Sequence, residues 1–193
     1  MMQPEPIGPG TTPGPQAIVP PRHPDAAQPG TPIGSHYRHC FGCGSAHPTG
    51  LHMLVTAGHG LTLSASFEVG PAHQGAPGLA HGGLLTAAVD EVLGALNWLL
   101  LRPAVTARLE TNFTRPVPVG SVLDLQARIT GVDGRKVYTA AIARLGPGGP
   151  VAVTASALFI RVEIGHFRSH GRPSEVALAI ADGDAGPPAE MNP

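Results

Sequence analysis

The sequence has few of the features that identify nucleic-acid-binding, secreted or membrane proteins. Only 13% of its 193 residues are charged, the net charge is -1, and there are only two cysteines. A nearly neutral chain has no basic field for nucleic acid, and two cysteines cannot form a disulfide framework. The beginning of the chain lacks the basic and apolar segments of a secretory signal and is poor in arginine. We therefore expect a cytoplasmic protein with neither a nucleic-acid nor a membrane partner.

Several catalytic signatures are also missing. The chain contains no GxSxG elbow, no Walker loop, no HExxH and no GxGxxG. Their absence leaves no motif-based reason to assign an α/β-hydrolase, a nucleoside triphosphatase, a zinc peptidase or a dinucleotide-binding protein.

Glycine and proline are abundant but unevenly distributed. The chain has 26 glycines and 22 prolines, which are concentrated in residues 1–34 and again in the polar stretch 165–193. Neither stretch carries enough large apolar side chains to offset its chain entropy. We therefore predict a disordered leader over 1–34, one folded domain over 36–164, and a flexible tail over 165–193 in which SEVALAIAD forms a short helix.

The stretch 84–101 is apolar at nearly every position, so a helix here has no polar outer face. It must be enclosed by lipid or by other structure. Asp90 and Glu91 leave only 92–101 uninterrupted, whereas a membrane span needs roughly 20 apolar residues. The sequence thus predicts a core helix. Its small and polar side chains recur at spacings that place them in one stripe facing a site, namely Thr86, Asp90, Gly94 and Asn97.

Alternation of apolar and polar residues predicts strands on both sides of this helix. Two precede it and four follow it, over residues 51–57, 61–69, 105–114, 123–130, 135–145 and 151–163. Short connections, such as the turn at Asp133-Gly134, favour antiparallel pairing. A helix that is apolar all round is buried among about six strands only if the sheet curls around it. The predicted class is therefore α+β with a hot-dog fold, and its long edge strands favour a homo-oligomer.

The helix is preceded by His81-Gly82-Gly83, which is a candidate oxyanion hole. The first N–H groups of a helix have no helical acceptor and lie at the positive end of its dipole, and glycine allows a carbonyl to approach closely. The alternative is that the two glycines only permit a tight turn into the helix.

Asp90 is the second candidate, because a carboxylate within an apolar helix is costly unless it is paired or functional. The plainer interpretation of Asp90 is a satisfied core acid or a dimer contact. Glu91 lies about 100° further round the helix and is a rival candidate for the base.

Gly82 and Asp90 are eight residues apart, or about 12 Å along the helix axis, too far for both to contact one carbonyl. A site shared by two subunits with antiparallel helices removes this difficulty.

The segment HYRHCFGCG contains Cys40 and Cys43 as a CxxC pair with several histidines nearby. A structural zinc site needs four ligands, usually two spaced pairs. The second pair would have to come from irregularly spaced histidines such as His47 and His52. We therefore interpret the segment as a turn whose thiols pack against the domain, with zinc binding and redox activity as the alternatives.

The runs GAPGLAHGGLLTAAVDE and AVTARLETNFTRPVPVG resemble the hot-dog acyl-CoA thioesterases of the phenylacetate-pathway (PaaI-like) and 4-hydroxybenzoyl-CoA type. The resemblance covers about residues 39–163. It implies an acyl-CoA hydrolase that acts as a dimer or tetramer, with coenzyme A as part of the substrate and no metal or other cofactor. A non-catalytic acyl-CoA or lipid-binding hot-dog protein is the alternative, and a hydratase is less favoured because His81 lies at the helix entrance.

The resemblance also implies roles for particular residues. Gly82, with His81 and Gly83, corresponds to the oxyanion donors, Asp90 to the acid that activates water or attacks the thioester, and Thr106 to a threonine that holds the water. Two further sets are weaker candidates for substrate binding: the loop residues His73 and Gln74, and the strand-end cation Arg115.

Overall fold

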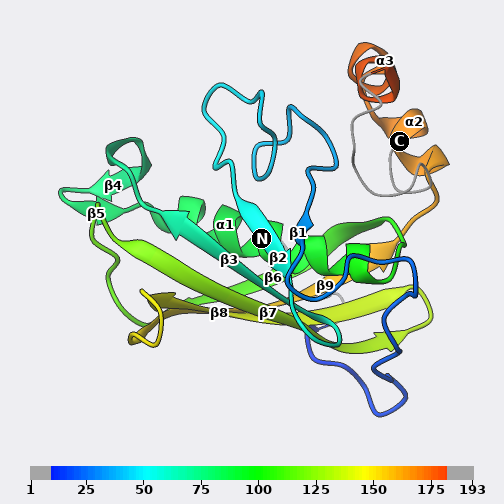
Figure 1. The fold of residues 1–193 in the computed structure, drawn as a ribbon, viewed down its shortest axis with the longest axis horizontal. Helices are drawn as coiled ribbons and strands as arrows, with labels where there is room; N and C mark the ends of the chain where they lie inside the picture. Colours follow the sequence, from blue (N-terminus) through cyan, green and yellow to red (C-terminus); the bar gives the residue numbers. More distant parts are fainter. Residues whose placement is uncertain (1–9, 182–193) are drawn as a thin grey trace, which may run out of the picture.

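The computed structural model describes residues 10–181, which form an antiparallel sheet wrapped around one helix (Figure 1). The sheet strands are β1 (Pro32–Ile33), β2 (Leu54–Ala57), β3 (Thr62–Glu68), β6 (Ala104–Phe113), β7 (Val122–Asp133), β8 (Lys136–Leu145) and β9 (Val151–Arg161). Their order is β1-β2-β3-β7-β8-β9-β6, and all neighbours are antiparallel. The short turn η1 (Pro71–His73) and the hairpin β4 (Gln74–Ala76) with β5 (Leu79–Ala80) lead into the helix.

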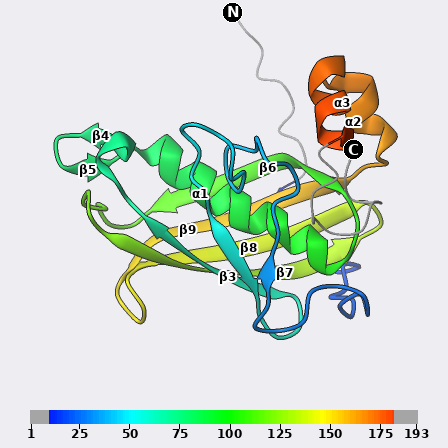
Figure 2. The same ribbon diagram turned by 45° about the horizontal axis from the view of Figure 1, so that its top comes forward.

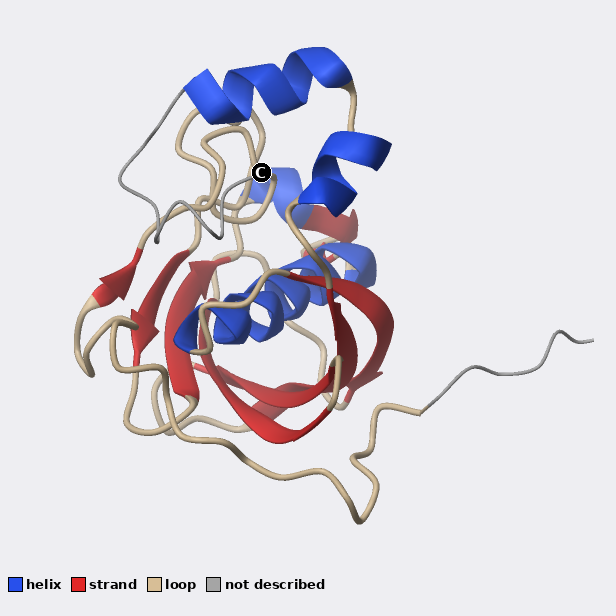
Figure 3. Ribbon diagram, turned by 90° about the vertical axis from the view of Figure 1, so that its right-hand side faces the viewer, coloured by secondary structure: helices blue, strands red, loops and turns tan. Residues whose placement is uncertain are grey.

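Helix α1 (Gly82–Ala95) continues as the tighter turn η2 (Leu96–Leu99), and the chain leaves it through Leu101, whose φ is 47°. The helix lies across the concave face of the sheet, and the strands curve around it (Figures 2 and 3). Six of its side chains are buried there, namely Leu85, Ala88, Val89, Val92, Leu93 and Ala95. This arrangement confirms the hot-dog fold and the central helix predicted from the apolar run.

The predicted hairpins are present in the structure. β2 pairs with β3, and β7 pairs with β8 around a turn in which Gly134 has a φ of 55°. Only glycine adopts such a backbone conformation without strain, which explains the Asp-Gly signal. The first predicted strand begins later than expected, at Leu54, because residues 51–53 bond to the backbone of the cysteine segment instead.

The long strand β6 departs from the predicted alternation. It is an edge strand, and its register against β9 shifts between Thr106 and Arg108, so that Ala107 is an extra residue. A bulge changes which side chains face the core, and Thr106 accordingly faces α1, as Leu109 does, although the alternation places the two on opposite faces. Phe113 lies beside Gly82 but is 52% exposed, because an edge strand has no further neighbour to cover it.

The described part of the predicted leader, residues 10–34, contacts the sheet at several points. Thr11 is buried and hydrogen-bonds to Glu110 and Ser156, and Ile18 forms a bridge with Val132. Composition indicates that such a segment cannot form a core of its own. It does not prevent the segment from docking on an existing sheet through its backbone. Residues 1–9 lie outside the described part.

Beyond β9 the chain forms two short helices, α2 (Gly165–His170) and α3 (Pro173–Ala181). α3 matches the predicted short helix, whereas the rest of the predicted tail, 182–193, lies outside the described residues. The two helices stand above the end of α1 (Figure 1). Tyr37 Oη donates a hydrogen bond of 2.8 Å to Glu175, which joins α3 to the loop before β2. Over residues 10–181 no helix is long and apolar enough to cross a membrane.

Candidate active site

The middle of α1 carries Asp90, whose carboxylate faces β6. Thr106 Oγ1 donates a hydrogen bond of 3.1 Å to Asp90 Oδ1. The two residues are sixteen apart in sequence and are brought together because α1 packs along the edge strand. The fold thus brings together two residues that the resemblance assigned to one site, and the threonine bonds directly to the acid.

Asp90 and Thr106 line a pocket of about 650 Å³ beneath α2 and α3. Three members of the predicted polar stripe of α1 face it, namely Asp90, Gly94 and Asn97. The remaining walls are largely apolar, with Trp98 from η2, Phe159 from β9, and Phe167 and Val176 from the two terminal helices. The stripe therefore faces a cavity in which an apolar group can lie beside a carboxylate.

Burial raises the pKa of Asp90, while the hydrogen bond from Thr106 acts in the opposite direction and lowers it. Desolvation disfavours a charged carboxylate, which makes it a better proton acceptor than a carboxylate in water. The environment of Asp90 therefore suits a general base that is held in place by one hydrogen bond.

The start of α1 presents a different arrangement. His81 is the N-cap, and its Nδ1 accepts a hydrogen bond of 3.0 Å from the Gly83 N–H. Of the two predicted backbone donors, Gly83 is thus engaged by His81. For the Gly82 N–H there is no acceptor among residues 10–181. Gly82 N–H is consequently the donor that remains available to a ligand.

The three weaker candidates lie towards this end of the helix, and none lines the pocket. His73 accepts a hydrogen bond from the Gly70 N–H, and its carbonyl accepts from the His81 N–H. The Gln74 side chain accepts from the Gly78 N–H. Arg115 is exposed beyond β6 and donates to the Val151 carbonyl at 2.6 Å. The loop side chains thus shape the entrance to α1, and the arginine braces a strand end.

One chain does not bring the two parts of the predicted site together. Gly82 and Asp90 are eight residues apart on one helix, or about 12 Å along its axis. A Cβ atom built on Gly82 would lie 3.4 Å from Phe113, at the end of β6, whereas Asp90 contacts Thr106 near its beginning. The donor and the acid therefore lie beside opposite ends of the edge strand.

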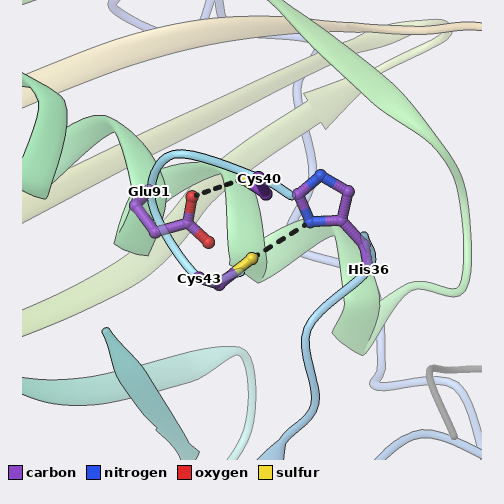
Figure 4. A group of neighbouring side chains, drawn as sticks. All are labelled: His36, Cys40, Cys43 and Glu91. Carbon is purple, nitrogen blue, oxygen red and sulfur yellow. Dashed lines mark hydrogen bonds between the residues drawn. The ribbon is translucent and has the colours of Figure 1, made fainter. Parts of the chain in front are cut away.

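Glu91, the rival base, faces another set of side chains. Glu91 Oε2 lies 3.8 Å from Cys40 Sγ, and Cys43 Sγ lies 3.4 Å from His36 Nδ1 (Figure 4). One ligand-type atom from each of these four residues lies within 4.8 Å of all the others. The histidines considered as companions of the CxxC pair, His47 and His52, are not part of this cluster.

Little in the sequence pointed to this grouping. Glu91 is 51 residues from Cys40 in the sequence. The regular spacing of polar residues along α1 includes Asp90 but not Glu91, so it does not indicate what Glu91 faces. His36 was visible near the CxxC pair, but nothing in the sequence distinguished it from the other nearby histidines. One indication was Glu91 itself. It is a second carboxylate within an apolar helix, and such a carboxylate needs a partner.

The sheet and its central helix define a hot-dog fold, and comparisons with known proteins agree with this fold class. A sequence model of the thioesterase superfamily matches residues 77–152, which contain α1, Asp90 and Thr106. Residues 77–152 are therefore similar in sequence to the thioesterase superfamily.

Individual relatives extend this result. The acyl-coenzyme A thioesterase THEM4 of Xenopus laevis is 32% identical over 96 residues, which are 50% of this chain and 43% of that protein. The chain thus spans less than half the length of the curated relatives it matches. The crystal structure of a thioesterase superfamily protein is 30% identical with a TM-score of 0.60, over 64% of this chain and 60% of the other.

A putative thioesterase of Ralstonia eutropha JMP134, described as related to phenylacetic acid degradation, shares the fold. Its TM-score is 0.52 at 23% identity, over 57% of this chain and 85% of the other.

Proposed function

We propose that this protein is an acyl-CoA thioesterase, which hydrolyses a thioester to a free acid and coenzyme A. The observation that carries the proposal is the pairing of Asp90 with Thr106 at the wall of a largely apolar pocket. A half-buried carboxylate beside a largely apolar cavity suits a reaction in which a base activates water next to an acyl group.

In the proposed reaction, the Gly82 N–H polarises the thioester carbonyl. Asp90 takes a proton from water as the water oxygen attacks the carbonyl carbon, and the negative charge that develops on the carbonyl oxygen is stabilised by the N–H donor. The C–S bond then breaks, and the departing coenzyme A thiolate is protonated. The reaction needs only water as co-reactant.

We infer that the donor and the acid of one site come from two subunits. β6 is an edge strand with unpaired backbone groups, which makes it a ready partner for a second copy. When two copies of β6 pair antiparallel about a two-fold axis, the Phe113 end of one strand meets the Thr106 end of the other. Gly82 of one subunit then faces Asp90 of the partner subunit.

The pocket beneath α2 and α3 is proposed to receive the acyl group. It begins at Asp90 and continues past Trp98 and Phe159 towards Val176. Its apolar walls favour a hydrophobic acyl chain or aryl group, which they would remove from water. The coenzyme A portion would extend outward from the carbonyl, towards the start of α1.

The test is release of free thiol from aryl-, short-chain and long-chain acyl-CoAs by the wild type, Asp90→Asn and a control, Asp133→Asn, at an exposed strand end. We expect turnover on some member of the panel and a loss of at least about a hundredfold for Asp90→Asn, the lower range for removal of a general base. Circular dichroism should show an unchanged fold, and the control should retain full activity.

The alternative of a non-catalytic acyl-CoA or lipid-binding protein predicts another outcome. Acyl-CoA would bind, as measured by calorimetry, but none of the panel would be hydrolysed. If instead Asp90→Asn hydrolysed acyl-CoA as fast as the wild type, Asp90 would not be the base.

A further inference from the structure

We propose that His36, Cys40, Cys43 and Glu91 bind a zinc ion that fastens the cysteine loop, residues 35–53, to helix α1. The loop supplies three of the ligands and the helix supplies the fourth (Figure 4). This site is distinct from the proposed thioesterase chemistry and does not depend on it.

Two distances within the cluster are close to an edge of a tetrahedral zinc site. Zinc bonds of about 2.3 Å to sulfur and about 2.1 Å to nitrogen or oxygen place such ligand pairs about 3.6 Å apart at a tetrahedral angle. The Cys40 Sγ to Glu91 Oε2 distance is 3.8 Å, and the Cys43 Sγ to His36 Nδ1 distance is 3.4 Å. Each sulfur therefore lies close to this separation from one other ligand, and all four ligand atoms lie within 4.8 Å of one another.

The loop is built so that its backbone can approach the carboxylate. A Cβ atom on Gly42 would lie 1.9 Å from Glu91 Oε2, and one on Gly44 would lie 2.5 Å from the Cys40 carbonyl. Both glycines of CFGCG are thus required, the first by Glu91 and the second by the turn. The turn is held by hydrogen bonds from Leu51 and Met53 N–H groups to the carbonyls of residues 41 and 42.

The side chains of the cluster are of the kind that a cation holds together. Cys40, Cys43 and Glu91 can supply two thiolates and a carboxylate, and one ligand-type atom of each lies within 4.8 Å of the others and of the His36 ring. A divalent ion would neutralise the repulsion between negative groups gathered so closely.

The ligand chemistry favours zinc over other ions. Two thiolates select a soft or borderline metal, and imidazole and carboxylate complete a tetrahedral set that is typical of zinc. When zinc binds, the two thiols release their protons to solvent. The site then contains two thiolates, one carboxylate, a neutral imidazole and Zn²⁺, and its net charge is about -1. A purely redox CxxC pair would not require that Glu91 contacts one thiol and His36 the other.

Four protein ligands leave no open position, so the ion would be structural. The ion would tie α1 to the cysteine loop through Glu91. Because Asp90 directly precedes Glu91, the ion would also help to hold Asp90 in position. His36 and Glu91 also line the pocket, and the His36 ring lies 5.8 Å from that of Trp98. The ion would thus fix one wall of the pocket.

The test is metal content. The full chain is expressed with added zinc and passed through a desalting column with a chelator. Its zinc content is then measured by mass spectrometry. In a second measurement cobalt(II) replaces the zinc, and the visible spectrum is recorded. We expect about one zinc ion per chain and the intense bands of tetrahedral, thiolate-bound cobalt. Cys40→Ser and Cys43→Ser should retain less than about a tenth of the zinc, and His36→Ala and Glu91→Gln should lose it or change the cobalt spectrum.

Two neighbouring variants serve as matched controls. His39→Ala lies in the same loop and Asp90→Asn beside Glu91, and both should keep the zinc. Circular dichroism separates loss of the ion from loss of the fold. The proposal is overturned if wild-type protein keeps no zinc and gives no thiolate-to-cobalt band, or if His36→Ala and Glu91→Gln leave the metal content and the spectrum unchanged. An intramolecular disulfide in freshly purified protein would overturn it in favour of a redox pair.

Discussion

The two functional regions of α1 differ in where their partners come from. At its start, His81, Gly82 and Gly83 are consecutive, and the N-cap bond that positions them is formed within three residues. In its middle, Asp90 is paired with Thr106 from β6, and Glu91 lies against Cys40 from a distant loop. The start of the helix is thus a local structure, whereas its middle is assembled by tertiary packing.

This difference determines how each region can be altered. A backbone donor is removed only by a residue without an N–H, while a side chain in the middle of the helix can be replaced with little change in volume.

The largest effect is expected from Gly82→Pro. Proline is accommodated at the first helical position, and the extended conformation of His81, with ψ of 130°, is compatible with a following proline. The variant therefore removes the proposed oxyanion donor without breaking the helix. We expect kcat to fall about 10²- to 10³-fold, measured by thiol release.

Gly82→Ala is the control, because it keeps the N–H and its Cβ atom would make an ordinary contact, 3.4 Å from Phe113. Its activity should remain close to that of the wild type. Equal losses in the two variants would show that the position needs glycine for space and not for its donor.

Mixing two inactive variants tests whether the start and the middle of α1 come from different subunits. Gly82→Pro and Asp90→Asn chains, unfolded together and refolded as a mixture, form heterodimers in half of the assemblies. Each heterodimer has one intact site if the site is shared, so about a quarter of the wild-type activity should return. A site contained in one chain predicts no recovery.

A smaller effect is expected from Thr106→Val, which keeps the shape of the side chain and removes the hydrogen bond to Asp90. A hydrogen bond to a charged group contributes about 1.5 kcal/mol at the lower end of its range, so kcat/KM should fall roughly tenfold. Thr111→Val on the same strand is the control, because the Thr111 hydroxyl has no partner among the described residues. Equal kcat/KM values for the two variants would contradict a positioning role for Thr106.

Much of the fold was predictable because it depends on short-range patterns. The apolar run of α1, the alternation in β3 and β7, and the turn at Gly134 each determine a local structure directly. The exposure of Phe113 and the contacts of residues 10–34 could not be predicted in this way. In both places the outcome depends on neighbours far away in the sequence, namely the position of β6 at the edge of the sheet and the sheet surface that residues 10–34 contact.

The candidate site divides in the same way. The glycines before α1 and the position of Asp90 on its polar stripe could be identified in advance, since a helix relates residues three and four apart in a fixed manner. The cluster of His36, Cys40, Cys43 and Glu91 could not, because no periodicity relates a loop to a helix 50 residues later.

The amino-acid sequence by itself thus determined a central apolar helix, the strands around it, and the acid and glycines that suggest a thioesterase. Only the tertiary structure decided that Glu91 turns to the cysteines, that Asp90 turns to Thr106 and the pocket, and that Gly82 lies at the far end of the same edge strand. The physical reason is that local geometry follows from neighbouring residues, whereas contacts between distant segments follow from how a closed core is packed.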